Sequence, residues 1–345
     1  AGPVSVSMGR ISYRGPEPGP AREVRIPSAR LEAGAAGGSR LQALVRTGGR
    51  RFEIDATGGP LADLADPARA YVFSGTVLDG AGGILGAAGR LPPRPAEALL
   101  EIALATPDPS AWSTAGGTEL PARGVALQAR VSRSGPVWRL APVAVESAGA
   151  RAAGTLEVGL DQAVPVLTGA LRLSGLDFPA DGGAGAPPAL QVLELPGTFP
   201  FAARVTLAGD VLRLGDTVLR EPTVQVVVTG SHLRLTDFRA GIEGVPVHGS
   251  ALIALEDGGA RATAAAWVPD TPADALAPAL GGRLGARAAA SVRLEPGAAR
   301  TLGEVLAAVR LHALGLRYRD AATGTRLAAG LRDEAPPGAL WPGNR

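Results

Sequence analysis

The chain has no cysteine and no lysine, and only 4% of its 345 residues are aromatic. Without cysteine, disulfides, thiolate nucleophiles and cysteine-ligated zinc sites are excluded. Without lysine, a Walker A phosphate-binding loop is excluded as well. Because aromatic residues are few and there is only one methionine, the apolar residues are mainly alanine, leucine and valine. These suit close backbone approaches and repetitive surfaces better than one deep core.

The charge pattern argues against a nucleic-acid partner. The chain carries 34 basic and 32 acidic residues, for a net charge of +2. Its arginines are spread singly, as at Arg10, Arg14 and Arg22, and do not form the clustered basic stripe that binds nucleic acid. We therefore expect no nucleic-acid binding.

No apolar run approaches the roughly 20 residues of a transmembrane helix, and the first ten residues do not have the pattern of a signal peptide. We expect any targeting or anchoring segment to lie outside this chain. Glycine and proline make up more than a fifth of the residues, yet 46% of the chain is hydrophobic, so an ordered fold is expected. A chain of 345 residues predicts two domains or an elongated architecture.

Apolar and polar residues alternate with period two along most of the chain, which predicts β-strands with one apolar face. Glycine-containing turn signals separate the strands at Gly48-Gly49, Asp79-Gly80, Gly182-Gly183, Gly209-Asp210 and Asp257-Gly258. The set predicted to face inward from these strands is Val4, Val6, Phe52, Ile54, Val125, Leu127, Val131, Leu156, Val158, Val205, Leu207, Val226, Val228, Leu233 and Leu235.

Four short stretches break this alternation and predict helices: Leu61 to Ala65, Pro107 to Ala115, Thr271 to Leu280 and Leu302 to Ala308. They are too few to be crossovers after every strand. The predicted fold is mostly β, an elongated, curled antiparallel sheet forming an apolar groove, with a few short helices.

Internal similarity supports a repetitive sheet. The segment that begins at Val137-Trp138-Arg139-Leu140 matches the one that begins at His232-Leu233-Arg234-Leu235, which lies 95 residues later. A second match joins Val4 to Arg14 with Val309 to Arg319, which lies 305 residues later. The second copy ends with the chain, so we expect the chain to be part of a longer repetitive protein.

Residues suited to catalysis or metal binding are scattered. His232, His248 and His312 lie in predicted strands without metal-ligand spacing. The acidic pairs Asp63 with Asp66 and Asp177 with Asp181 lie near turns and helix starts, where aspartate is expected to cap. We predict that the chain is not an enzyme and has no metal site and no cofactor.

Several degenerate motifs occur in a recognisable order. Arg51 to Leu64 reads as a strand that ends in glycine before a short leucine-rich helix, and Val137-Trp138-Arg139-Leu140, Gly154-Thr155-Leu156 and Pro165 to Leu171 follow. This order resembles the AsmA family of bacterial envelope proteins, which includes AsmA, TamB and YhdP, over roughly residues 1 to 325.

The resemblance implies a protein of the bacterial periplasm, anchored in the inner membrane by a helix that this chain lacks. It implies non-enzymatic binding and bridge-like transfer of phospholipid, whose acyl chains lie in an apolar β-groove, in support of outer-membrane biogenesis. The domain division that follows is an AsmA-like groove segment at 1–185, its continuation with the repeat unit at 186–325, and a C-terminal tail at 326–345 that starts a truncated repeat. The alternative is a structural or adhesive β-rich envelope protein, a solenoid or sandwich, with a closed core and no ligand.

Overall fold

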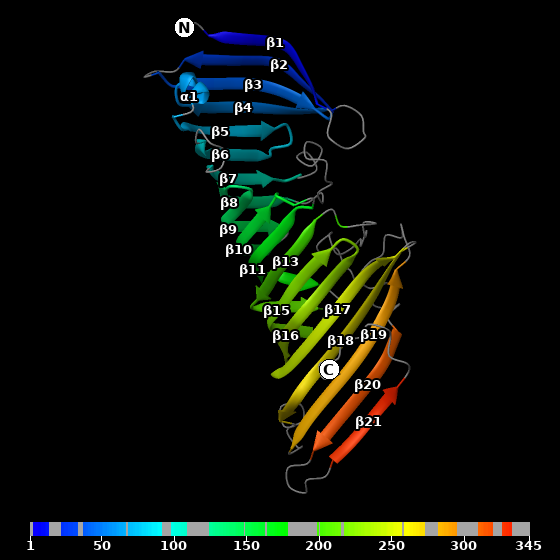
Figure 1. Ribbon diagram of the computed structural model, residues 1–345. Helices are drawn as coiled ribbons and strands as arrows, with labels where there is room; N and C mark the ends of the chain where they lie inside the picture. Colours follow the sequence, from blue (N-terminus) through cyan, green and yellow to red (C-terminus); the bar gives the residue numbers. More distant parts are fainter. Residues whose placement is uncertain are drawn as a thin grey trace. The chain divides into compact units, whose positions relative to one another are not determined.

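The computed structural model describes residues 3–13, 22–33, 37–66, 68–91, 98–108, 124–147, 149–162, 164–178, 199, 201–214, 217–256, 259–272, 282–294, 310–319 and 326–332. These residues form 21 strands and one short helix (Figure 1). The prediction of a mostly β, antiparallel fold is confirmed.

The chain divides into two compact units. The first contains Ala1–Ala148 and Ala153–Asp161, and the second contains Gly149–Ala152 and Gln162–Arg345. The boundary placed at residue 185 from the sequence lies within the second unit. The segment described as a tail contains a strand, since residues 326–332 pair with the strand before them.

The first unit is a meander in which each strand from β1 to β8 pairs antiparallel with the next (Figure 1). Its strands are β1 (Val4–Tyr13), β2 (Arg22–Ala33), β3 (Ser39–Thr47), β4 (Arg50–Gly58), β5 (Tyr71–Asp79), β6 (Ile84–Leu91), β7 (Leu99–Thr106), β8 (Val125–Ser134), β9 (Val137–Ser147) and most of β10 (Ala150–Gly159). β10 pairs with β9.

The second unit is also mainly antiparallel, but β11 pairs with β13, and β12 with β14, in parallel. Its strands are β11 (Val166–Ser174), β12 (Leu176–Phe178), β13 (Ala202–Gly209), β14 (Val211–Leu214), β15 (Thr217–Thr229), β16 (His232–Ile242), β17 (Val245–Glu256), β18 (Gly259–Pro272), β19 (Arg283–Leu294), β20 (Arg310–Arg319) and β21 (Arg326–Arg332). Parallel neighbours need a connection of about a dozen residues or more. Residues 179–201, between β12 and β13, are long enough to supply it.

The predicted turns fall between strands wherever the structure describes them. Gly48 and Gly49 join β3 to β4 with φ angles of 56° and 79°, a left-handed pair that glycine adopts without strain and that suits a two-residue hairpin. The turns expected at Gly182-Gly183 and Asp257-Gly258 lie outside the described residues.

The helix predictions have mixed outcomes. The helix at Leu61–Ala65 (α1) is confirmed. The prediction from Thr271 is wrong at its start, because Thr271 and Pro272 complete β18, opposite Leu284 and Arg283 of β19. Cross-strand pairing there outweighs the capping pattern that suggested a helix. Pro107 and Asp108 are not helical, and the rest of that stretch, the remainder after Pro272 and Leu302 to Ala308 lie outside the described residues.

The 95-residue repeat is a repeat of structure. The hairpin β9–β10 and the hairpin β16–β17 begin, turn and resume at equivalent positions, and Gly149 and Gly244 in their turns both have φ of 83°. Each first strand also carries a bulge at the same place, where β9 shifts register against β8 and β16 shifts register against β17. The matching sequences therefore fold into matching hairpins, β9–β10 and β16–β17.

Packing is confined to neighbouring strands. Among the described elements, those in extensive contact are hydrogen-bonded neighbours within the sheets. A sandwich would need a second sheet packed about 10 Å above the first. The described strands all belong to one hydrogen-bonded sheet, so within the described residues each unit is a single layer.

Two glycines of β6 test how tightly this layer is packed. A methyl group on Gly89 would lie 2.5 Å from the carbonyl oxygen of Leu99 and 2.7 Å from a methyl carbon of Leu100, whereas on Gly86 the nearest atom would be 3.8 Å away. We expect Gly89→Ala to lower the free energy of unfolding by about 1–3 kcal/mol, because backbone must move. Gly86→Ala, the matched control, should change it by about 0.5 kcal/mol or less. Urea unfolding monitored by circular dichroism measures both, and equal effects would contradict this packing.

Candidate functional site

Residues directly opposite each other on antiparallel strands project from the same face, so the register traces each face from strand to strand. In the first unit one face carries two apolar rows across β1 to β9. The first row is Val6, Ala29, Ala43, Ile54, Val77, Leu85, Leu104, Leu127 and Val145, and the second is Val4, Leu31, Leu41, Ala56, Gly75, Ala87, Ile102, Ala129 and Val143. We call this the apolar face, and the opposite one the polar face.

An ion pair extends the apolar face to β10. Arg139 of β9 lies opposite Ser132, which is on the polar face of β8. Its Nε is 3.7 Å from Oε1 of Glu157, which places Glu157 on the polar face too. Since neighbouring residues of a strand alternate, Leu156 and Val158 project from the apolar face.

The second unit has the same arrangement. One row comprises Leu167, Ala203, Val228, Leu233, Ile253, Ala262 and Val292, and the next comprises Gly169, Val205, Val226, Leu235, Ala251, Ala264, Ala290 and Leu311. Together these rows cross β11 to β20, and they define the apolar face of this unit. None of their members is charged.

All fifteen residues predicted to face inward lie on the apolar face of their unit. Phe52, Val131, Val205 and Val228 are buried, with 5–7% of their surface exposed. Val4 and Val6, on the edge strand, are 60% and 46% exposed, and the other nine are half-buried. The apolar faces thus combine a packed centre with side chains that remain accessible to a ligand.

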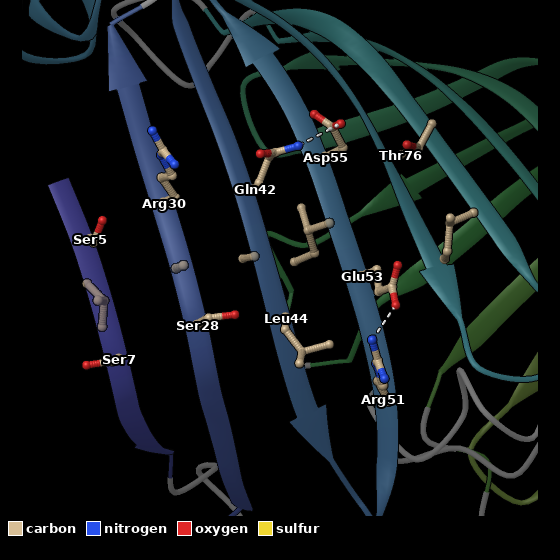
Figure 2. Close-up of a pocket in the computed structure, with 15 residues that line it drawn as sticks. Ser5, Ser7, Ser28, Arg30, Gln42, Leu44, Arg51, Glu53, Asp55 and Thr76 are labelled. Atoms are coloured by element: carbon tan, nitrogen blue, oxygen red, sulfur yellow. Dashed lines mark hydrogen bonds and ion pairs between the residues drawn. The ribbon is translucent and has the colours of Figure 1, made fainter. Parts of the chain in front are cut away.

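The polar face of β1 to β5 is hollowed instead by small polar and charged side chains. Figure 2 shows Ser5, Ser28, Gln42, Asp55 and Thr76 projecting from successive strands on this side. The hollow has a volume of about 750 Å³. Its lining also includes Leu44 and Leu78, and four residues of the first apolar row: Val6, Ala29, Ala43 and Ile54.

Charges around this hollow neutralise one another. Arg51 Nη2 lies 2.7 Å from Glu53 Oε1, and Arg40 Nη2 lies 2.8 Å from Asp55 Oδ2. The hydrogen bond from Arg40 lowers the pKa of the Asp55 carboxyl, and the bond from Gln42 lowers it further. Both carboxylates are therefore engaged by side chains of the sheet itself.

Charged residues on the apolar face of the first unit occur at strand ends. Arg50, the first residue of β4, forms an ion pair with Asp108 at 3.2 Å. The Arg133 guanidinium lies 5.2 Å from the centre of the Trp138 ring. Asp79, the last residue of β5, turns its carboxylate into the following loop. The interior of the apolar face is left without charge.

Sequence reasoning missed many members of the rows. Ile102 and Leu104 in β7 show the same alternation as the predicted strands, so the pattern was available there. Ala264 and Ala290 could not be found, because alanine stands on both faces of β18 and β19, and only the register separates them.

Among the residues weighed for catalysis, His232, His248, Asp63 and Asp66 each contact a neighbouring side chain. His232 bonds through Nδ1 with the Ser231 hydroxyl at 3.0 Å, and the His248 ring lies 5.8 Å from that of Trp267 across β17 and β18. Arg69 forms ion pairs with both Asp63 and Asp66, with Nη1 3.3 Å from Asp63 Oδ1 and Nε 3.3 Å from Asp66 Oδ2. The described residues contain no group of three or more histidine, aspartate or glutamate side chains placed to hold a metal ion.

Within the described part of the chain, no helix has the length and apolar character needed to cross a membrane. No family model, no curated protein and no solved structure matches this chain.

The role of Asp79 in holding the loop after β5 can be tested by substitution. Its Oδ1 accepts hydrogen bonds from the amides of Ala81 at 2.8 Å and Gly83 at 2.6 Å, while its buried Oδ2 has no partner in the structure. Asp79→Ala should lower the free energy of unfolding by about 1–3 kcal/mol, because two amides lose their acceptor. Asp79→Asn keeps an acceptor at Oδ1 and should lose much less. Chemical unfolding of both variants checks this, and an Asn variant as unstable as the Ala variant would show that the charge matters instead.

Proposed function

We propose that this chain binds phospholipid acyl chains on its apolar faces and passes them along, without catalysis, in the periplasm of a bacterium. The observation that carries the proposal is the set of uncharged rows that run from strand to strand on one face of single-layer sheets. A dry core would need a second layer over that face.

Burial of hydrocarbon supplies the binding energy. Each methylene group moved from water onto apolar surface contributes about 0.8 kcal/mol. Strands are spaced about 4.8 Å apart, so a row across nine strands extends on the order of 40 Å. An acyl chain lying across the strands would meet apolar side chains over its whole length, while its headgroup remained in water.

Side-chain size along the rows favours a shallow track. In the second row of the first unit, Leu31 and Leu41 are followed by Ala56, Gly75 and Ala87 before Ile102. Small residues in the middle leave room for a ligand between bulkier ones. With charges restricted to the strand ends, a hydrocarbon chain could slide from strand to strand without passing a desolvated charge.

The polar faces suit an aqueous compartment, since their carboxylates are paired with arginines and exposed to solvent. The periplasmic location, the inner-membrane anchor and the role in outer-membrane biogenesis rest on the resemblance of the sequence to the AsmA family. Other envelope proteins that meet the chain are not identified by its residues.

A single fluorophore on each face of β8 tests lipid binding directly. The chain has no cysteine, so Leu127→Cys and Gln128→Cys each give one labelling site, on the apolar and polar face respectively. We expect an environment-sensitive dye at position 127 to brighten when vesicles of phosphatidylethanolamine and phosphatidylglycerol are added, since acyl chains replace water there. The dye at position 128 should not respond. Equal responses, or none, would contradict binding on the apolar face.

Charge on the apolar face should also reduce co-purified lipid. We expect Leu127→Glu and Leu156→Glu each to lower the phospholipid retained by protein purified from a bacterial envelope, as measured by native mass spectrometry with lipid extraction, because a carboxylate is costly beside hydrocarbon. Gln128→Glu, on the exposed polar face, is the matched control. Lipid-free wild-type protein, together with glutamate variants that unfold, would favour a closed core and the structural alternative.

A further inference from the structure

Four arginines stand side by side on the polar face of the first unit. Arg25 of β2 lies opposite Arg10 of β1 on one side and opposite Arg46 of β3 on the other. Arg46 in turn lies opposite Arg51 of β4. These residues are 15, 21 and 5 positions apart in the sequence, so only the register brings them together. We call them the arginine row.

Two members of the row reach the polar face through an irregularity in the strands. Regular alternation from Val6 would place Arg10 on the apolar face. However, the register of β2 against β3 shifts by one residue between Arg25 and Ser28. At the same place in β1, Met8 has a φ of 55°, which is rare for a residue other than glycine. Such irregularities re-aim side chains, and here they turn Arg10 and Arg25 to the polar face.

Ion pairs confirm that these side chains share a face. Oε1 of Glu23 lies 3.5 Å from Nε of Arg10 and also accepts a hydrogen bond from Arg25. At the other end of the row, Arg51 is paired with Glu53, as Figure 2 shows. The arginine row therefore holds four positive charges beside two negative ones.

This arrangement differs from that of β7 and β8 on the same face, where Arg130 lies opposite Glu101 with Nη2 2.8 Å from Oε1. Arg46 has an arginine opposite it on both sides, and it forms no ion pair within the described part of the chain. Like charges directly opposite each other destabilise a strand pair. A bound anion would remove that cost, and Arg46 lies where it would do so most.

The length of the row indicates the kind of anion. Neighbouring strands lie about 4.8 Å apart, so the row extends over roughly 14 Å. All four side chains are exposed to solvent. A single phosphate group could contact only part of such a row, whereas a surface that carries many phosphates could meet all of it. The row contains no aromatic side chain on which the bases of a nucleic acid could stack.

We propose that the arginine row binds the phosphate groups of anionic phospholipids at a bilayer surface and so docks the polar face of β1 to β4 on a membrane. Guanidinium groups suit this role because they engage phosphate oxygens in a bidentate manner. The site lies on the face opposite to the apolar rows, so it is separate from acyl-chain binding.

Vesicle sedimentation tests the row through Arg46. The full chain is mixed with vesicles of phosphatidylglycerol and phosphatidylcholine, or of phosphatidylcholine alone, and the bound fraction gives a partition coefficient. We expect phosphatidylglycerol to raise this coefficient. Arg46→Gln should lower it about five-fold on the anionic vesicles, the contribution of one arginine near such a surface.

Arg130→Gln is the matched control, because it removes the same charge from the same face of the same unit. Arg130 lies four strands beyond β4, farther than the Debye length of about 10 Å, so binding should not change. Since Arg46 is exposed and flanked by like charges, Arg46→Gln should leave the urea midpoint of unfolding unchanged or raised. A lowered midpoint would show a structural role instead.

The ionic strength separates this contact from acyl-chain binding. At an ionic strength of about 1 M the Debye length is about 3 Å, so the part of the binding that depends on phosphatidylglycerol should be lost. The dye at position 127 reports on the apolar face independently. Loss of its response with unchanged sedimentation would count against acyl-chain binding alone, and the reverse result would count against the arginine row alone.

Equal effects of Arg46→Gln and Arg130→Gln, equal binding to both kinds of vesicle, or binding that survives high salt would each overturn the proposal. Competitors are compared with sodium chloride at the same ionic strength. Displacement by inorganic phosphate would assign the row to a small free anion, and displacement by hexaglutamate would assign it to an acidic protein segment, so either result would overturn the proposal as well.

Discussion

Cross-strand register is the constraint on which the rest of this molecule depends. Side chains of a strand alternate between faces, so a slip of one residue would move every apolar side chain to the other side. Ile54, Val77 and Leu85 remain on one face because each lies directly opposite the next. The same pairings set Asp55, Thr76 and Gly86 against one another on the polar face. Both surfaces of the layer are therefore products of a single set of backbone hydrogen bonds.

In a one-layer sheet, no second layer packs on the strands to fix their register, so other contacts must do so. Short turns such as Gly48-Gly49 help to fix the register of the strands that they join. Side chains at strand ends contribute too, since the Asp79 carboxylate accepts hydrogen bonds from two amides of the next loop. Close approaches such as that of Gly89 to the Leu99 carbonyl leave little freedom for a strand to shift. The charged groups on the apolar face of the first unit lie at these ends, so they do not interrupt the apolar rows.

The repeats connect this local order to the proposed function. β9–β10 and β16–β17 share their turns and the bulge in their first strand, and β1–β2 and β20–β21 share their register. A sheet assembled from such similar segments presents a similar apolar face wherever it is extended. A lipid track is a natural use of that architecture, whereas a pocket for one small molecule would require a local departure from it.

The sequence alone determined that the chain is mostly β and which residues of the clearest strands share a face, because period-two alternation at Phe52 and Ile54, or at Val125 and Leu127, is a direct consequence of strand geometry. It also determined the repeats, including the 305-residue match at Tyr13 and Tyr318. It could not align one strand with the next, assign the alanines of β18 and β19 to a face, or show that Thr271 and Pro272 remain in a strand. Those outcomes were decided by the tertiary structure, because pairing joins residues that are distant in the chain and leaves no signature in the sequence of either strand.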